Sequence, residues 1–111
     1  MDDERARSLL GAERRRVERL LTETTSAGRD DRSQANQPGD LTDPAERLTA
    51  EQQDDAVAAQ LRDRLVALDR AEARLGKGEF GFSIRSGVPI PDERLEADPA
   101  VELTVEEAED S

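Results

Sequence analysis

Residues 2–25 carry apolar side chains at the three- and four-residue steps of an α-helix. Arg, Glu, Leu and Ala dominate this stretch, and all four residue types favour helix. The apolar positions form one narrow stripe, which is interrupted at Glu13: Ala6, Leu10, Val17, Leu20 and Thr24. A stripe of this width is typical of a seam between two helices. The pattern therefore predicts a first helix that ends near Thr25.

A second helical pattern ends at Leu75, and two starting points for it are open. Asp43 followed by Pro44 fits an N-cap and a first helical position. The segment from Thr49 to Gln52 fits a capping box instead. Gly76 is predicted as the C-cap. The apolar seam, interrupted at Glu72, comprises Val57, Ala58, Leu61, Leu65, Leu68 and Leu75.

Residues 26–42, SAGRDDRSQANQPGDLT, are predicted to form a polar loop between the two helices. Neither helix can bury its stripe alone, so the simplest arrangement is an antiparallel hairpin with this loop at its tip. The break between the two stripes favours a monomer over a dimer. The heptad spacing of Leu61 and Leu68 is also compatible with dimerisation.

The period changes after Gly76, where the chain becomes rich in Gly and Pro and predicts a compact, turn-rich unit over residues 77–104. Residues 91–97 predict a short helix that stops before Pro99. The acidic residues 105–111 are predicted to be a disordered tail, and residues 1–76 the hairpin domain. Seven apolar side chains are expected to form a small core: Phe80, Phe82, Ile84, Val88, Ile90, Leu95 and Leu103.

Composition narrows the function classes. The chain has 111 residues, a net charge of −11 and neither Cys nor His, which excludes disulfides, thiol and imidazole catalysis and the usual zinc ligands. The acidity disfavours binding to nucleic acid and favours a basic protein partner. No apolar run approaches the length of a membrane span, and the N-terminus lacks a signal-peptide core, so a cytoplasmic location is expected. Arg14, Arg15, Arg16 and Arg19 are expected to pair with acids of their own helix, namely Glu13, Glu18 and Glu23.

Three short motifs at fixed offsets resemble the DksA/TraR family of RNA polymerase-binding proteins. They are Gly78-Glu79-Phe80-Gly81, Gly87-Val88-Pro89-Ile90 and Arg94-Leu95-Glu96-Ala97-Asp98-Pro99. The family's frame fits residues 43–107 without a gap. The resemblance implies a mainly α fold, in which an antiparallel helical hairpin, or coiled coil, is followed by a small zinc-ribbon-like knuckle and a short C-terminal helix.

The family holds zinc with two cysteine pairs, and in this frame they fall on Ser83 and Ser86 and on Thr104 and Glu107. Neutral hydroxyl groups are poor zinc ligands, and a single carboxylate does not complete a tetrahedral site. We therefore predict a degenerate knuckle without metal or other cofactor. Its serines are expected to keep the turn through hydroxyl-to-backbone hydrogen bonds.

The resemblance also implies a function. The family carries the motif D-x-x-D-x-A at the hairpin tip, and the nearest match places acids at Asp43 and Glu46, with Asp40 nearby. The expected protein is a non-enzymatic transcription regulator that inserts this acidic tip into the secondary channel of RNA polymerase. Direct DNA sequence recognition and membrane association are not expected. The alternative is a divergent acidic module for protein interaction or dimerisation, without activity on the polymerase.

Overall fold

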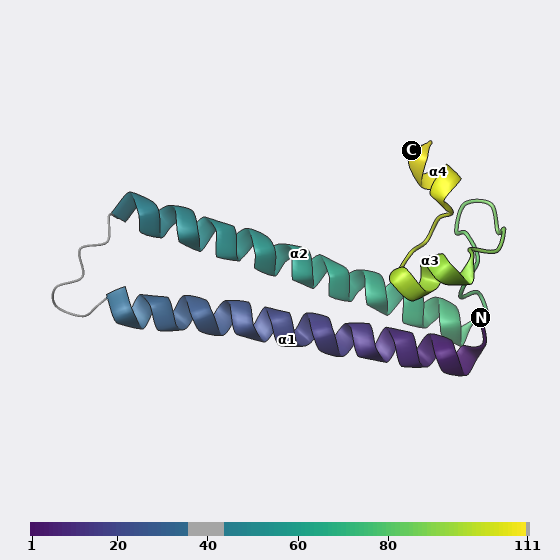
Figure 1. Cartoon of the computed structure of the whole chain (residues 1–111), viewed down its shortest axis with the longest axis horizontal. Coiled ribbons are helices and arrows are strands. Elements are labelled where there is room, and N and C mark those ends of the chain that lie inside the picture. Colours follow the sequence, from purple (N-terminus) through teal and green to yellow (C-terminus); the bar gives the residue numbers. More distant parts are fainter. Residues whose placement is uncertain (36–43, 111) are drawn as a thin grey trace. The chain divides into compact units, whose positions relative to one another are not determined.

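The structure is a computed structural model that describes residues 1–35 and 44–110, with side chains described for residues 1–25 and 55–110. It contains four helices, α1 (Asp3–Ala35), α2 (Pro44–Gly76), α3 (Asp92–Ala97) and α4 (Val105–Glu109) (Figure 1). Within these ranges there is no β-strand, only an isolated bridge between Phe82 and Pro89. The predicted mainly α class is confirmed.

The chain divides into two compact units. We call Met1–Arg15 together with Leu65–Ser111 the base unit, and Arg16–Arg64 the hairpin unit. The C-terminal segment after Gly76 therefore shares a compact unit with the first part of α1 and the last part of α2. The domain boundaries at 76/77 and 104/105 stay predictions.

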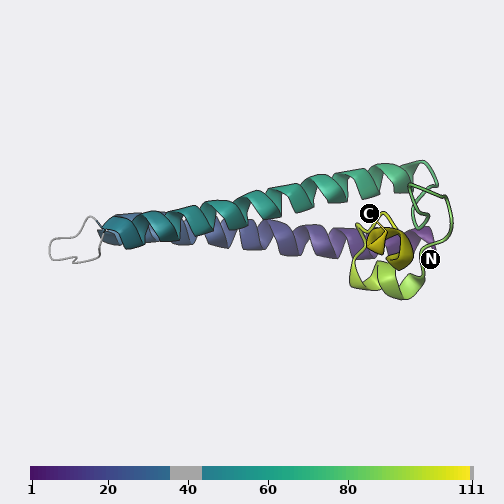
Figure 2. The same cartoon turned by 90° about the horizontal axis from the view of Figure 1, so that it is seen from above.

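In the hairpin unit, the second part of α1 and the first part of α2 lie side by side in opposite directions (Figures 1 and 2). Val17 and Ala58 are buried in this unit, as the stripes predicted. Two other apolar side chains of this unit are less buried: Leu20 is 36% exposed and Val57 is 44% exposed. Among the described side chains, this unit therefore has a narrow apolar seam.

The predicted end of α1 near Thr25 is wrong, because the helix continues for ten residues to Ala35. The polar segment that was assigned to a loop contains Arg, Gln and Ala, which favour helix, and the first proline comes only at Pro38. Gly28 weakens a helix but does not end it. The helix therefore continues through a polar sequence, because residues 26–35 contain no proline that would interrupt its backbone hydrogen bonds.

The observed start and end of α2 test the two predicted starting points and the predicted C-cap. The helix begins at Pro44, which confirms the Asp43-Pro44 start and contradicts the start at Thr49. Its C-cap glycine is Gly78, with φ of 75°, and not Gly76, which is the last helical residue. Gly78 N–H donates to Leu75 O at 3.1 Å and Glu79 N–H to Arg74 O at 2.8 Å. This is the hydrogen-bond pattern of a Schellman motif, which needs the left-handed residue two positions later than predicted.

The core of the base unit combines residues from α1, α2, α3 and the loop between α2 and α3. The N-terminus of α1 is capped by Asp2, whose carboxylate accepts a hydrogen bond from Arg5 N–H at 2.7 Å. The buried apolar side chains of this unit are Ala6, Leu10, Leu68, Ala71, Ile90, Leu95 and Ala100. No helix among the described residues is long and apolar enough to cross a membrane.

The predicted core of the turn-rich segment is only partly right. Ile90 and Leu95 are buried, while Phe80 and Leu103 are half-buried. Phe82, Ile84 and Val88 are exposed, which corrects the expectation that they would pack inside. The long helices already fill most of the base-unit core, so only two side chains of the seven are needed to complete it.

The short helices give one confirmation and one correction. Helix α3 ends at Ala97, before Pro99, as predicted, and it buries Leu95. The tail predicted to be disordered from residue 105 instead forms α4. Thr104 and Glu107 build a complete capping box at its start, and this satisfies two N–H groups that a short helix would otherwise leave without partners.

Candidate functional site

The turn over residues 81–90 carries the first two positions that the sequence assigned to zinc ligands. Gly81 and Gly87 have φ of 89° and 78°, a region that residues with side chains rarely adopt. Ser83 N–H donates to Val88 O at 2.8 Å, and Ile90 N–H donates to Gly81 O at 2.8 Å. Main-chain hydrogen bonds therefore fix the turn, and glycines make its backbone path accessible.

Ser83 is buried inside this turn, with 4% of its surface exposed. Its hydroxyl oxygen accepts hydrogen bonds from Arg85 N–H at 3.1 Å and from Ser86 N–H at 3.2 Å. The Ser86 hydroxyl accepts from Val88 N–H at 3.4 Å. The serine hydroxyl groups are thus hydrogen-bonded to the backbone of the turn, as expected, and they act as acceptors.

The other two positions, Thr104 and Glu107, lie at the start of α4. The Thr104 hydroxyl accepts from Glu107 N–H at 3.2 Å, and the Glu107 carboxylate accepts through Oε1 from Thr104 N–H at 3.1 Å. The sequence carries the signature of this capping box, T-x-x-E. From the sequence, the same two residues were assigned to a lost metal site, and their role as a helix cap was not predicted.

A hydrogen bond joins the turn over residues 81–90 to the start of α4. The Ser83 hydroxyl donates to Glu107 Oε2 at 2.9 Å, across 24 residues of chain. The Arg85 side chain also donates, through Nη1, to the main-chain oxygen of Glu107 at 3.2 Å. Ser83, Ser86, Thr104 and Glu107 thus form one hydrogen-bonded group, which we call the polar cluster. The structure brings together all four positions that the family's frame assigned to ligands.

The polar cluster holds Glu107 in its ionised form. Its contacts lower the pKa of Glu107 from 4.5 to about 2. The Ser83 hydroxyl is the largest cause, hydrogen bonds from Thr104 and Ser86 add to it, and desolvation of the carboxylate acts in the opposite direction. A carboxylate that accepts several hydrogen bonds is favoured over its neutral form. Glu107 is therefore an anion throughout the neutral range.

The residues of the polar cluster do not fit a zinc ion. The Ser83 hydroxyl keeps its proton, because it donates to Glu107, while both carboxylate oxygens already accept hydrogen bonds. Zinc sites need deprotonated or imidazole ligands. Among the residues that the structure describes, no group of three or more His, Cys, Asp or Glu could hold a metal. Hydrogen bonds connect the turn to the start of α4 here, where bonds between thiolates and a metal would connect them in a zinc site.

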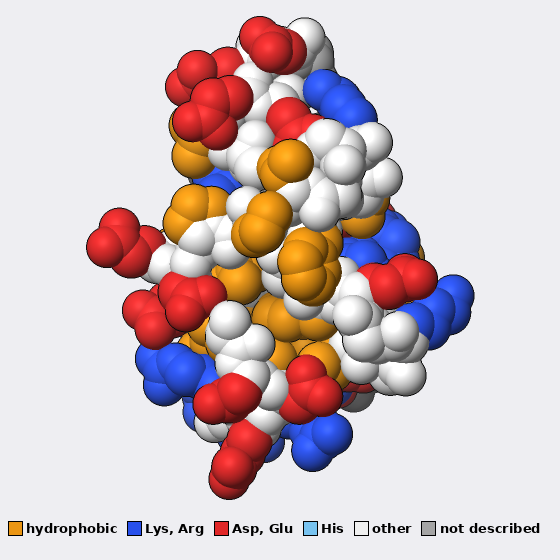
Figure 3. All heavy atoms as spheres, turned by 90° about the vertical axis from the view of Figure 1, so that its right-hand side faces the viewer, with side chains coloured by type: hydrophobic (Ala, Val, Ile, Leu, Met, Phe, Trp, Pro, Cys, Tyr) orange, Lys and Arg blue, Asp and Glu red, His pale blue; other side chains and the backbone are white. Residues whose placement is uncertain are grey.

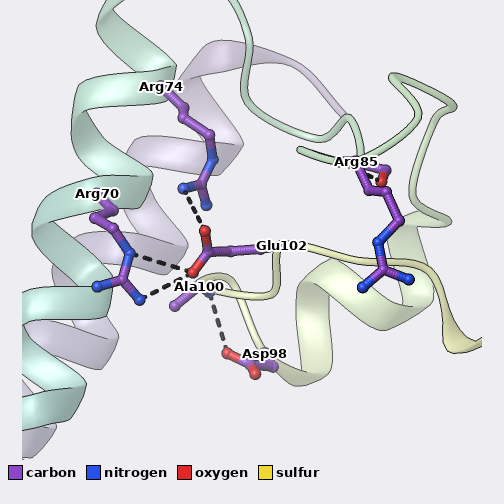
Figure 4. A network of polar contacts seen from close by, with 7 residues as sticks. Arg70, Arg74, Arg85, Asp98, Ala100 and Glu102 are labelled. Carbon is purple, nitrogen blue, oxygen red and sulfur yellow. Dashed lines mark hydrogen bonds and ion pairs between the residues drawn. The ribbon is translucent and has the colours of Figure 1, made fainter. Parts of the chain in front are cut away.

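Glu102 ties the segment between α3 and α4 to helix α2 (Figure 4). Its carboxylate lies 2.9 Å from Arg70 Nη2 and 3.4 Å from Arg74 Nη1. Its main-chain oxygen accepts from Ile84 N–H at 3.0 Å, so the same residue also contacts the turn. Arg74 and Glu102 are largely buried, with side chains 13% and 21% exposed, which reduces screening by water. No pattern in the sequence predicts this connection, because Arg74 and Arg70 lie 28 and 32 residues before Glu102 in the chain.

The first turns of α1 are tied to the same unit. Arg5 pairs with Glu96 of α3 at 2.9 Å, and the N-terminal amino group pairs with Asp92 at 3.2 Å. Arg14 pairs with Asp69 and Glu72 of α2, two partners that the sequence analysis did not name. These hydrogen bonds raise the pKa of Arg14, with Glu72 as the largest cause. Glu72, the acid that interrupts the apolar seam of α2, is thus an ion-pair partner of Arg14.

The proposed tip acids have no described geometry. Asp40 and Asp43 lie outside the described residues, and Glu46 belongs to α2 but its side chain is not among those described. Their role stays a prediction from the sequence. The described part of the site is the polar cluster and the surface around it.

The fold defines a class of protein: a helical hairpin followed by a short turn-rich segment with two small helices. A search of solved structures finds the transcription factor DksA2 from Pseudomonas aeruginosa, with a TM-score of 0.82 and 26% sequence identity. The match covers 97% of this chain and 81% of that chain. No family model matches the sequence, and no curated protein matches it.

The likeness extends over almost the whole chain, so it covers both long helices and the C-terminal segment. The resemblance derived from the three sequence motifs is confirmed. The chain is thus DksA-like in its fold, and it contains no cysteine.

Proposed function

We propose that this DksA-like protein is a non-enzymatic transcription regulator that binds RNA polymerase. The observation that carries the proposal is the likeness to a transcription factor over 97% of the chain at a TM-score of 0.82. A fold alone does not define a function. The sequence adds independent support, because the chain is acidic, with a net charge of −11, and lacks the residues of thiol or imidazole catalysis.

The proposed mode of binding inserts the end of the hairpin that carries Asp40, Asp43 and Glu46 into the polymerase secondary channel. Residues 30–55 contain eight acids and two arginines. An acidic segment is attracted to a basic channel that holds a catalytic metal ion. The partner is the polymerase itself, and neither a DNA sequence nor a membrane is part of the proposal.

Binding and transcription assays test the proposal. The full chain should bind core RNA polymerase at micromolar concentration and change the yield of a transcript in vitro. The double variant Asp43→Asn, Glu46→Gln removes two charges from the proposed tip and should bind but lose most of the effect on transcription. Absence of wild-type binding at micromolar concentration would overturn the proposal.

A cleavage experiment tests the position of the tip directly. Replacing the catalytic Mg²⁺ of the polymerase by Fe²⁺ generates hydroxyl radicals in the active site. If the tip is inserted, a bound chain with a label at its N-terminus should be cut near residues 40–46, and its base unit should not be cut. Cutting that is uniform along the chain, or confined to α4, would contradict insertion of the tip.

The alternative, a dimerisation module, would use the seam of Leu61, Leu65 and Leu68. Leu68 is completely buried within the base unit, and Leu61 and Leu65 are half-buried. A second chain could reach Leu68 only if the base unit opened. Burial of Leu68 therefore supports a monomer, and sedimentation of the free chain at micromolar concentration should show one.

A further inference from the structure

Two segments of the base unit, residues 77–89 and residues 101–110, contribute almost nothing to its apolar core. The only side chains that these two described segments bury are those of Ser83 and Thr104, which both carry hydroxyl groups. We call the two segments together the polar flap. Figure 3 looks onto the base unit and shows carboxylates and uncharged atoms at the top, where α4 lies, and hydrophobic side chains mainly in the middle.

Polar contacts join the two segments of the polar flap to each other. The Ser83 hydroxyl donates to Glu107 Oε2 at 2.9 Å, and Arg85 Nη1 donates to Glu107 O at 3.2 Å. Ile84 N–H donates to Glu102 O at 3.0 Å. Each of these bonds has its donor in the first segment and its acceptor in the second. If either segment left its place, polar groups of the other would lose their partners, so the positions of the two segments are coupled.

A single carboxylate fastens the polar flap to the side chains of α2. Glu102 accepts from Arg70 Nε at 3.2 Å, from Arg70 Nη2 at 2.9 Å and from Arg74 Nη1 at 3.4 Å (Figure 4). Of the charged side chains of the flap, Glu102 alone forms ion pairs with α2 within the ranges that the structure describes. The main-chain oxygen of Arg74 also accepts from Glu79 N–H at 2.8 Å. Arg74 thus contacts both segments of the flap.

The other charged groups in and around the polar flap do not replace this fastening. Arg85 acts inside the flap, and Arg94 of α3 donates to the main-chain oxygen of Leu103 at 2.9 Å. Lys77 has an exposed side chain. The remaining charged side chains are exposed acids, namely Glu79, Glu106, Glu109 and Asp110. Without the Glu102 contacts, the flap is therefore held by the covalent chain, by single hydrogen bonds and by half-buried side chains.

We propose that the polar flap opens as one cooperative unit, with Glu102 as its latch, while α1, α2 and α3 stay packed. A region with few buried apolar side chains opens at a lower free energy than the core, and segments that share contacts open together. Once released, the segments unfold, because α4 has only five residues and a helix of that length is not stable alone. A partner that binds only one of the two states shifts the equilibrium between them. This inference concerns the free chain and does not depend on the proposed function.

Hydrogen exchange of the full chain, followed by nuclear magnetic resonance, tests the proposal. The reporters are the N–H groups of Ser83 and Gly87 in the first segment and of Ala108 in the second, each of which donates to a main-chain oxygen of its own segment. Glu102→Gln keeps the shape of the side chain and removes its charge. All three amides should exchange faster by the same factor, about tenfold or more, because hydrogen bonds to a charged group are lost. Leu95 N–H in α3 should keep its rate.

Glu96→Gln is the matched control. Glu96 also pairs with an arginine, Arg5, at 2.9 Å, but it lies on α3 outside the polar flap. This variant should leave the three flap amides at their wild-type rates. Equal acceleration by both variants would show that Glu102 has no special role and would overturn the proposal.

The other outcomes are equally decisive. Acceleration of only one segment in Glu102→Gln would show that the two segments do not open together. Equal acceleration of Leu95 N–H, or a loss of helical circular dichroism signal, would show that the core opens with the flap. Unchanged flap amides would show that Glu102 is not the latch. Each of these results overturns the proposal.

Proteolysis measures the same opening independently. Trypsin cleaves after arginine, and Arg85 lies in the first segment of the polar flap. Cleavage after Arg85 in the folded chain should be faster in Glu102→Gln by about the factor that hydrogen exchange gives, and unchanged in Glu96→Gln. Equal cleavage rates at Arg85 in the wild type and in Glu102→Gln would overturn the proposal.

Discussion

The Ser83 hydroxyl donates a 2.9 Å hydrogen bond to the carboxylate of Glu107, which lies 24 residues further along the chain. This contact joins the turn after α2 to the start of α4 at the positions where the family carries metal ligands. This hydrogen bond and the one from Arg85 Nη1 to the main-chain oxygen of Glu107 thus connect the two segments. The following predictions test this role.

Ser83→Ala should loosen the turn. The change removes the donor to Glu107 and leaves Arg85 N–H and Ser86 N–H without their acceptor. Loss of these hydrogen bonds at a buried position costs about 1–3 kcal/mol, so the amides of Arg85 and Ser86 should exchange with solvent at least several-fold faster. Hydrogen exchange measured by nuclear magnetic resonance checks this.

Ser86→Ala is the matched control for that experiment. Ser86 is exposed, and its hydroxyl accepts a long hydrogen bond of 3.4 Å from Val88 N–H, while Ser83 is the acceptor for the amides of Arg85 and Ser86. Its removal should change exchange rates little. Equal effects of the two substitutions would contradict a special role for Ser83.

The stability of the protein should depend on pH through Glu107. Its pKa is about 2 when folded and 4.5 ordinarily, so the unfolded state binds the proton more readily. The stabilisation is complete above the ordinary value and declines as pH falls from 4.5 towards 2. Glu107→Gln removes this titration, so the stability difference between wild type and variant should shrink between pH 6 and pH 3.

Urea unfolding followed by circular dichroism at both pH values measures that difference. Glu109→Gln is a suitable control, because Glu109 is an exposed acid of the same helix. A difference between wild type and Glu107→Gln that is constant with pH would show that the carboxylate does not act through its charge.

The four positions of the polar cluster should accept zinc when their chemistry is changed. The wild-type protein should purify without stoichiometric zinc, and a chelator should leave its melting temperature unchanged. The quadruple variant Ser83→Cys, Ser86→Cys, Thr104→Cys, Glu107→Cys supplies four thiolates, the donor set of structural zinc sites. It should bind one zinc ion per chain and lose stability with a chelator.

Metal analysis and melting curves measure both effects. A folded quadruple variant that binds no zinc would show that the four positions are not arranged around a common point. Stoichiometric zinc in the wild type would show that its ligands lie elsewhere.

Gly28→Pro should interrupt α1 in the segment that the sequence assigned to a loop. Proline inside a helix costs about 3 kcal/mol, because it removes a backbone hydrogen bond and clashes with the preceding turn. The variant should lose helical circular dichroism signal, whereas Gly28→Ala should gain helix stability by about 0.5–1 kcal/mol. If both variants give the wild-type spectrum, the segment is not helical.

Local chemistry was enough to predict much of this fold. Propensity and periodicity predicted both long helices, and Pro44 marked the correct start of α2, because proline fits the first helical turn. The absence of Cys and His excluded a thiolate or imidazole metal site directly. The end of α1 was predicted ten residues too early, since polarity by itself does not break a helix and the first proline comes only at Pro38.

The tertiary structure decided what local chemistry leaves open. Phe82 and Ile90 are equally apolar in the sequence, yet Ile90 is buried and Phe82 is exposed, because the core supplied by α1, α2 and α3 has room for only some of them. The sequence analysis assigned Thr104 and Glu107 to lost ligand positions, and only the structure shows that they cap α4 and that Glu107 also accepts from the Ser83 hydroxyl. The sequence by itself determined the helices and ruled out thiolate and imidazole ligands, because both follow from residue types at short range. Contacts across tens of residues determined the surface and the polar cluster, because they depend on which segments the fold brings together.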